Sequence, residues 1–157
     1  MHREMVSEKQ QSTAGYRHWQ SLSNGFLVCL AIVGPTFLFE ELWRGQPMID
    51  QGGADWLWPA AIIGLGYFIG GRVAGRNRST LTGAFNQGLL VAALTLGMTF
   101  VADVIRRIIL SEAPTFKVLA IWIASAAGAL IMGGLGGING RRATRRAQRR
   151  YQMERFH

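Results

Sequence analysis

Formal charge is missing from four long stretches of this chain. Its 26 charged residues fall into five short blocks, and the four stretches between them run 22, 16, 24 and 23 residues, namely 18–39, 56–71, 79–102 and 118–140. A transmembrane helix needs about 20 mostly apolar residues, because the hydrocarbon core is about 30 Å thick. Three stretches reach that length, and the second reaches it if Asp55 and Arg72 lie at the two interfaces. The pattern predicts an integral membrane protein with four spans.

The same stretches lack the residues that chemistry in a membrane uses. No ionisable side chain lies deep in a predicted span, so a proton relay has no visible carrier. His2, His18 and His157 are terminal or interfacial, which excludes haem held between histidines inside the bilayer. No G-x-S-x-G, H-E-x-x-H or P-loop motif occurs. The single cysteine, Cys29, excludes an intramolecular disulfide. We expect neither an enzyme nor a cofactor or metal site.

The positive charge is distributed unevenly among the five blocks. Counted along the chain, alternate blocks hold 3, 3 and 7 Lys and Arg residues, against 1 and 3 in the other two. The positive-inside rule therefore predicts that both termini and the middle connection face the cytoplasm, in the inner (plasma) membrane. So strong a bias argues against the antiparallel dimers formed by small proteins of dual topology.

The spans fix the expected domain organisation. We predict a polar cytoplasmic segment over 1–20, a transmembrane domain over 21–140 and a polybasic cytoplasmic tail over 141–157. Within the domain the predicted spans are about 21–42, 54–75, 81–105 and 115–139. The fold class is all-α, a four-helix bundle.

Two weak sequence matches suggest that a helical hairpin occurs twice. Residues 24–37 align without gaps with 87–100, at an offset of 63, with six of 14 positions identical. In the second and fourth spans, Gly71-x-x-x-Gly75-Arg matches Gly136-x-x-x-Gly140-Arg at an offset of 65. A tandem repeat of two spans keeps its orientation, so it would place a pseudo-two-fold axis along the membrane normal.

Small residues recur every four positions in the second and fourth spans. Such spacing lets two helical backbones approach closely in lipid, where no hydrophobic force drives helices together. We predict that spans 2 and 4 meet near the cytoplasmic side; lining of a pore is the alternative. The predicted packing residues are Gly66, Gly70, Gly71, Gly75, Ser125, Ala129, Gly133 and Gly137.

Polar residues near the span ends form two further candidate groups. Asn24, Asn86 and Gln87 lie about one turn inside the cytoplasmic boundary, where an Asn24–Gln87 hydrogen bond between spans is favoured over a polar vestibule. Asp103 precedes Arg106 and Arg107 by three and four residues, the spacing of ion pairs on a helix. We expect these three to form a solvated network at the interface, with a gate or an anion docking point as the alternative.

Arginine pairs follow the fourth span at every fourth residue. A juxtamembrane cluster of this size anchors the topology and attracts anionic lipid headgroups at the cytoplasmic face. Docking of an acidic protein partner is the alternative, and nucleic acid is not expected, because no nucleic-acid-binding module accompanies the cluster. The residues are Arg141, Arg142, Arg145, Arg146, Arg149 and Arg150.

The chain as a whole resembles small, glycine-rich, four-span membrane proteins of bacteria. The resemblance rests on residues 70–76, the short turn to Thr82-Gly83, and the glycine-rich end of span 4 that runs into arginines. It implies the architecture and no activity. We therefore expect a non-enzymatic accessory or scaffolding subunit that packs against a larger membrane complex or against itself. The alternative is a small channel or transporter formed by an oligomer of glycine-rich helices.

Overall fold

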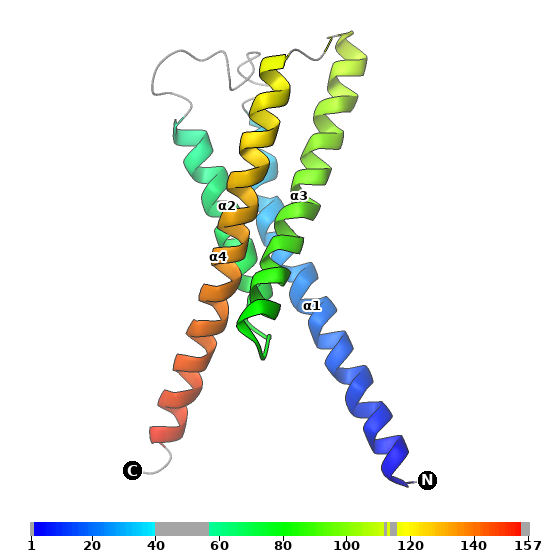
Figure 1. Cartoon of the computed structure of the whole chain (residues 1–157), viewed down its shortest axis with the longest axis vertical. Helices are drawn as coiled ribbons and strands as arrows, with labels where there is room; N and C mark the ends of the chain where they lie inside the picture. Colours follow the sequence, from blue (N-terminus) through cyan, green and yellow to red (C-terminus); the bar gives the residue numbers. More distant parts are fainter. Residues whose placement is uncertain (1, 40–56, 112, 114–115, 155–157) are drawn as a thin grey trace.

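The computed structural model describes residues 2–39, 57–111, 113 and 116–154, and these residues form helices with no strand among them. The helices are α1 (His2–Leu38), α2 (Leu57–Gly75), α3 (Leu81–Leu110) and α4 (Phe116–Glu154) (Figure 1). Each contains a stretch long and apolar enough to cross a membrane. The chain is therefore an all-helical multi-pass membrane protein, as the charge map predicts.

The helices at the two ends of the chain are longer than the predicted spans. Helix α1 begins at His2 and α4 continues to Glu154, so the polar segments predicted before residue 21 and after residue 140 extend the adjacent helices. The tail is rich in Arg, Ala and Gln, which favour helix even where nothing packs on them. Helix α3 likewise ends at Leu110 rather than 105. The predicted span limits at 42, 54 and 115 lie outside the described residues.

Local side-chain chemistry sets both ends of α3. Thr80 is its N-cap, with its hydroxyl oxygen accepting a 3.0 Å hydrogen bond from the Gly83 amide. This bond satisfies one of the amides that a helix start leaves unpaired. At the other end Ser111 adopts the left-handed conformation (φ 55°), and its amide donates to the Ile108 carbonyl at 3.3 Å. Turns of this kind terminate helices by pairing their last carbonyls.

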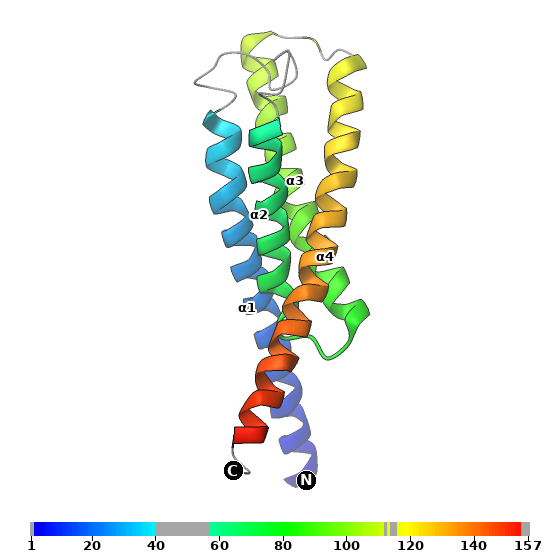
Figure 2. The same ribbon diagram turned by 90° about the vertical axis from the view of Figure 1, so that its left-hand side faces the viewer.

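Helices α2 and α3 are the central pair of the bundle. Each packs against the other three helices, whereas α1 and α4 pack mainly on this pair. We call the end that holds Arg72, residues 76–80 and Arg141 the basic end. Helices α1 and α4 both extend beyond it (Figures 1 and 2). The opposite end is called the Asp103 end below.

The core is made largely of small side chains. Cys29 and Val33 of α1, Tyr67 of α2, Val91 and Ala92 of α3, and Ala129 of α4 form one buried cluster. Many large apolar side chains, including Leu90 and Leu94, are instead exposed on the outside of the bundle. In a membrane protein such side chains face lipid, which is as apolar as they are.

Candidate functional site

Helix α2 contacts α4 backbone to backbone through glycines near the basic end. A Cβ atom on Gly71 would collide with the carbonyl oxygen of Gly133, and one on Gly75 would collide with that of Gly137. Gly133 also faces α3, where a Cβ would lie 2.7 Å from the Gly88 oxygen. There is no room for a side chain at Gly71, Gly75 or Gly133. The bundle is closed in this half by its own backbones.

The other two packing glycines predicted on α2 face a different helix. A Cβ on Gly70 would lie 2.6 Å from Cβ of Cys29, and one on Gly66 would lie 2.9 Å from Cγ2 of Val33. Both neighbours belong to α1. The sequence prediction assigned all four α2 glycines to the contact with α4, but successive glycines on a helix point to different faces and so divide between two partners.

The small-residue stripe of α4 is covered by other helices over only part of its length. Ala129 is buried, but Ser125, one turn nearer the Asp103 end, is exposed. A Cβ on Gly128 would meet nothing within 4 Å. Helix α4 leans away from α2 toward this end (Figures 1 and 2). The predicted close packing is therefore found only in the half of the bundle nearer the basic end.

A cleft of about 640 Å³ opens where α2 and α4 diverge. We call it the outer cleft. Its two walls are mostly small or apolar side chains, from α2 and α4, and α1 and α3 form its floor. Residues that line it include Ala60, Ala61 and Gly64 of α2, Ser125, Gly128 and Met132 of α4, Phe37 of α1, and Leu96 and Thr99 of α3.

Asp103 is the polar centre of the outer cleft. The residue is 3% exposed, and its carboxylate accepts hydrogen bonds at Oδ2 from Arg107 Nε at 2.8 Å and from Trp122 Nε1 at 3.1 Å. Arg106 Nη1 lies 4.0 Å from Oδ1. The Trp122 ring packs edge-on against Phe100, with 5.1 Å between centroids.

This network differs from the solvated one that the sequence predicts. The i,i+3 and i,i+4 pairs are present, but the carboxylate is buried, and Trp122 of the next helix, α4, also donates to it. The bonds of Asp103 thus tie α3 to α4 at the end where their backbones do not meet. A buried carboxylate needs such partners, since an unpaired charge away from water is costly.

Polar side chains follow one face of α3 at intervals of four residues. Gln87, Thr95, Thr99 and Asp103 are all buried, with Val91 in the same row. The Thr95 hydroxyl donates to the Val91 carbonyl at 2.9 Å, and the Thr99 hydroxyl donates to that of Thr95 at 3.1 Å. These hydroxyls are therefore satisfied within their own helix, as Ser and Thr often are in membrane helices.

Gln87 makes hydrogen bonds other than the predicted one to Asn24. Its Nε2 donates to the His18 carbonyl of α1 at 2.9 Å, and its Oε1 accepts from Arg78 Nε. Asn24 and Asn86 are exposed. The prediction of an Asn24–Gln87 pair is wrong because neither asparagine points into the bundle, whereas Gln87 does.

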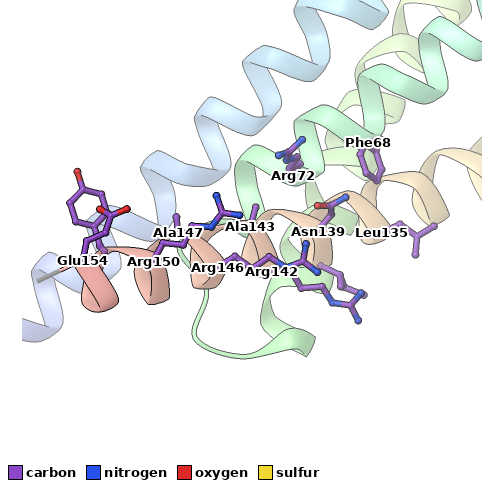
Figure 3. A pocket seen from close by; sticks show the side chains of 12 residues that line it. Phe68, Arg72, Leu135, Asn139, Arg142, Ala143, Arg146, Ala147, Arg150 and Glu154 are labelled. Carbon is purple, nitrogen blue, oxygen red and sulfur yellow. The ribbon is translucent and has the colours of Figure 1, made fainter. Parts of the chain in front are cut away.

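The arginines in the C-terminal part of α4 form two groups, with Arg149 in neither. Arg141 and Arg145 both donate from Nη2 to the carbonyl of Ser79, the latter at 3.3 Å, and so tie α4 to the connection between α2 and α3. Arg142, Arg146 and Arg150 lie on an adjacent face and line a hollow of about 870 Å³ together with Arg72 of α2 (Figure 3). Arg149 is exposed and lines neither feature.

Sequence reasoning missed Trp122, the two buried threonines and Arg72 as site residues. The every-fourth-residue spacing of polar side chains in span 3 is a signal that could have found Thr95 and Thr99. No sequence signal connects Trp122 to Asp103, because they lie on different helices. Among the described residues, no three His, Cys, Asp or Glu side chains gather in a group that could hold a metal ion.

Comparison of the chain with protein-family models, with curated proteins and with solved structures finds no match.

Proposed function

We propose that the chain is a non-enzymatic accessory or scaffolding subunit whose outer cleft receives a transmembrane helix of a partner membrane protein. The main observation in support is the cleft itself, in which small residues of α2 and α4 face each other without a helix between them. Nearer the basic end, the small residues of α2 and α4 are covered by another helix at backbone distance. Small residues favour helix association in membranes because they allow close backbone approach.

The rest of the architecture suits a scaffold. The half nearer the basic end is closed by glycine contacts, and Asp103 braces α3 against α4 at the other end. A rigid frame with one uncovered helical face is what a helix-binding subunit needs. We further propose that the chain lies in the inner membrane with the basic end in the cytoplasm, because 13 of its 17 Lys and Arg residues belong to the blocks on that side.

The proposed tandem repeat is supported by equivalent contacts in the two hairpins. Gly25 of α1 faces Gly70 and Ala74 of α2, and Gly88 of α3 faces Gly133 and Gly137 of α4. Every member of the second set is 63 residues after its counterpart in the first. The same offset of 63 relates the contact of Cys29 with Gly70 to the contact of Ala92 with Gly133.

The contacts between α2 and α4 are also paired, but at an offset of 65, two residues away from the register of the hairpin contacts. Gly71 of α2 faces Gly133 of α4. If the two halves exchange roles at an offset of 65, Gly71 corresponds to Gly136 and Gly133 corresponds to Phe68, and these two residues also touch. In the same way, the contact of Gly75 with Gly137 corresponds to the contact of Gly140 with Arg72. A pseudo-two-fold axis along the membrane normal would pass between α2 and α4.

Co-purification tests the scaffold proposal. The tagged full-length protein is extracted in mild detergent or native nanodiscs, and co-migrating membrane proteins are quantified by mass spectrometry. We expect a stoichiometric partner to be retained by the natural chain and reduced about tenfold or more by Gly128→Leu, which fills the cleft. Gly97→Leu is the control, since Gly97 has open space around it on the lipid-facing side of α3.

Three results would count against the proposal. They are the absence of a stoichiometric partner, equal loss of the partner in both variants, and a clean homo-oligomer, which would assign the cleft to a second copy of the chain.

A small channel or transporter is the second candidate function. The polar row of α3, from Gln87 to Asp103, favours it because it runs most of the length of the bundle. Flux through proteoliposomes above empty-liposome controls, lost in Thr99→Leu with folding retained, would establish this function and overturn the scaffold. Gly133→Leu is unsuitable for this test, because Gly133 touches two backbones and its replacement would disturb packing.

A further inference from the structure

The hollow at the basic end combines two chemically different halves. Phe68 of α2 and Leu135 of α4 lie at the end toward the membrane spans, and Arg142, Arg146 and Arg150 follow along α4 away from them (Figure 3). Arg72 joins the arginines from across the hollow. The hollow therefore changes from apolar to cationic along the direction in which a phospholipid changes from acyl chain to headgroup.

Among the residues that the structure describes, no ion pair joins a carboxylate to the four guanidiniums around the hollow. One carboxylate, Glu154, also lines it, at the far end of α4. The ion pairs of the described side chains, those of Asp103, lie at the opposite end of the bundle. Arg72 lines the hollow, and its Nε has no hydrogen-bond partner among the described residues. A guanidinium without a carboxylate partner favours a phosphate oxygen, which is a strong acceptor.

The arrangement of Arg142 and Arg146 distinguishes them from the neighbouring arginines. They lie one turn apart on α4, and both line the hollow. Arg141 and Arg145 are engaged with the Ser79 carbonyl, and the exposed Arg149 is not part of the hollow. The basic tail is thus not one uniform cluster. Only the face that carries Arg142, Arg146 and Arg150 shares the hollow with Arg72.

We propose that this hollow is a binding site for one anionic phospholipid of the leaflet at the basic end. Arg72, Arg142 and Arg146 hold the headgroup phosphate, and Phe68 and Leu135 contact the upper part of an acyl chain. A volume of about 870 Å³ is within the range of sites for small ligands. The site is separate from the outer cleft and does not depend on the scaffold proposal.

Native mass spectrometry of the full-length protein tests the site. The protein is released from nanodiscs of phosphatidylcholine with an equal fraction of phosphatidylglycerol, and the retained lipid is identified. We expect one phosphatidylglycerol per chain. Each arginine near a membrane surface strengthens contact with anionic lipid by about fivefold. Arg142→Gln/Arg146→Gln should therefore reduce retention by about tenfold or more, and Arg72→Gln by about fivefold.

A matched control distinguishes a specific lipid site from the general attraction of anionic lipid to positive charge. Arg76→Gln/Arg149→Gln removes two arginines from the same end of the molecule, at exposed positions that do not line the hollow. It should change retention by less than about twofold. Thermal unfolding of each variant in detergent checks that the fold is intact.

Three results would overturn the proposal. The first is equal loss of lipid in the control and site variants, and the second is equal retention of phosphatidylcholine and phosphatidylglycerol. The third is displacement of the lipid by millimolar inorganic phosphate, which would assign the arginines to a free anion.

Discussion

The indole N–H of Trp122 donates a 3.1 Å hydrogen bond to Oδ2 of Asp103, 19 residues earlier in the chain. The bond crosses from α4 to α3 at the end of the bundle where glycine contacts no longer hold helices together. Arg107 donates to the same oxygen from within α3. Asp103 is therefore a junction between a local ion pair and a tertiary contact.

Trp122→Phe should destabilise the fold. Phenylalanine keeps an aromatic ring next to Phe100 but removes the donor to Asp103. Loss of a hydrogen bond to a charged acceptor costs about 1–3 kcal/mol. The free energy of unfolding in detergent measures the loss. Trp58→Phe serves as the control, because Trp58 is 73% exposed. Equal stability of the two variants would contradict a structural role for the Trp122 bond.

Gly71→Ala should be destabilising although alanine is the better helix former. The added methyl group would overlap the carbonyl oxygen of Gly133, so α2 and α4 must separate. Overpacking of this kind costs about 1–3 kcal/mol. Gly97→Ala should be neutral or stabilising by up to about 1 kcal/mol, since Gly97 has no neighbour within 4 Å. Unfolding curves of the two variants make the comparison, and a stability loss in Gly97→Ala as large as that in Gly71→Ala would refute it.

Gln87→Leu and Asn24→Leu should behave differently. Removal of the Gln87 amide leaves the His18 carbonyl and Arg78 without their partner, so we expect a loss of about 1–3 kcal/mol. Asn24→Leu should have little effect, because the Asn24 side chain is exposed. Thermal unfolding of the two single variants and the double variant measures any coupling. Substantial coupling energy between the two sites would restore the Asn24–Gln87 pair predicted from sequence.

Arg141→Gln should loosen the connection between α2 and α3. Arg141 is buried and donates to the Ser79 carbonyl, which lies next to the N-cap of α3. Amide hydrogen exchange over residues 76–80 should become faster, while exchange in the centre of α3 stays unchanged. Arg149→Gln, with the same change of charge at an exposed position, should leave exchange over 76–80 as it is. If both variants accelerate exchange equally, net charge rather than the Ser79 contact sets the stability of the turn.

The extent to which sequence predicts each feature depends on how local its cause is. Four membrane helices follow from four uncharged stretches of sufficient length, and the ion-pair spacing of Asp103 with Arg106 and Arg107 follows from the helical repeat. The polar row of α3 is also visible as a spacing. In contrast, the partner of the Gln87 amide was predicted incorrectly. Which face of a helix turns into the bundle depends on the helices packed around it, and Asn24 lies on an exposed face.

By itself, the sequence determined that this chain is helical, that it crosses a membrane and that its charges lie at the ends of the spans. These properties depend on segment length and on the cost of charge in hydrocarbon, and both act within one segment. Tertiary structure alone decided that α2 divides its glycines between α1 and α4, that Trp122 encloses Asp103, and that Arg72 shares a hollow with Arg142 and Arg146. Each of these depends on how two helices cross, and that geometry arises only when all four backbones pack at once.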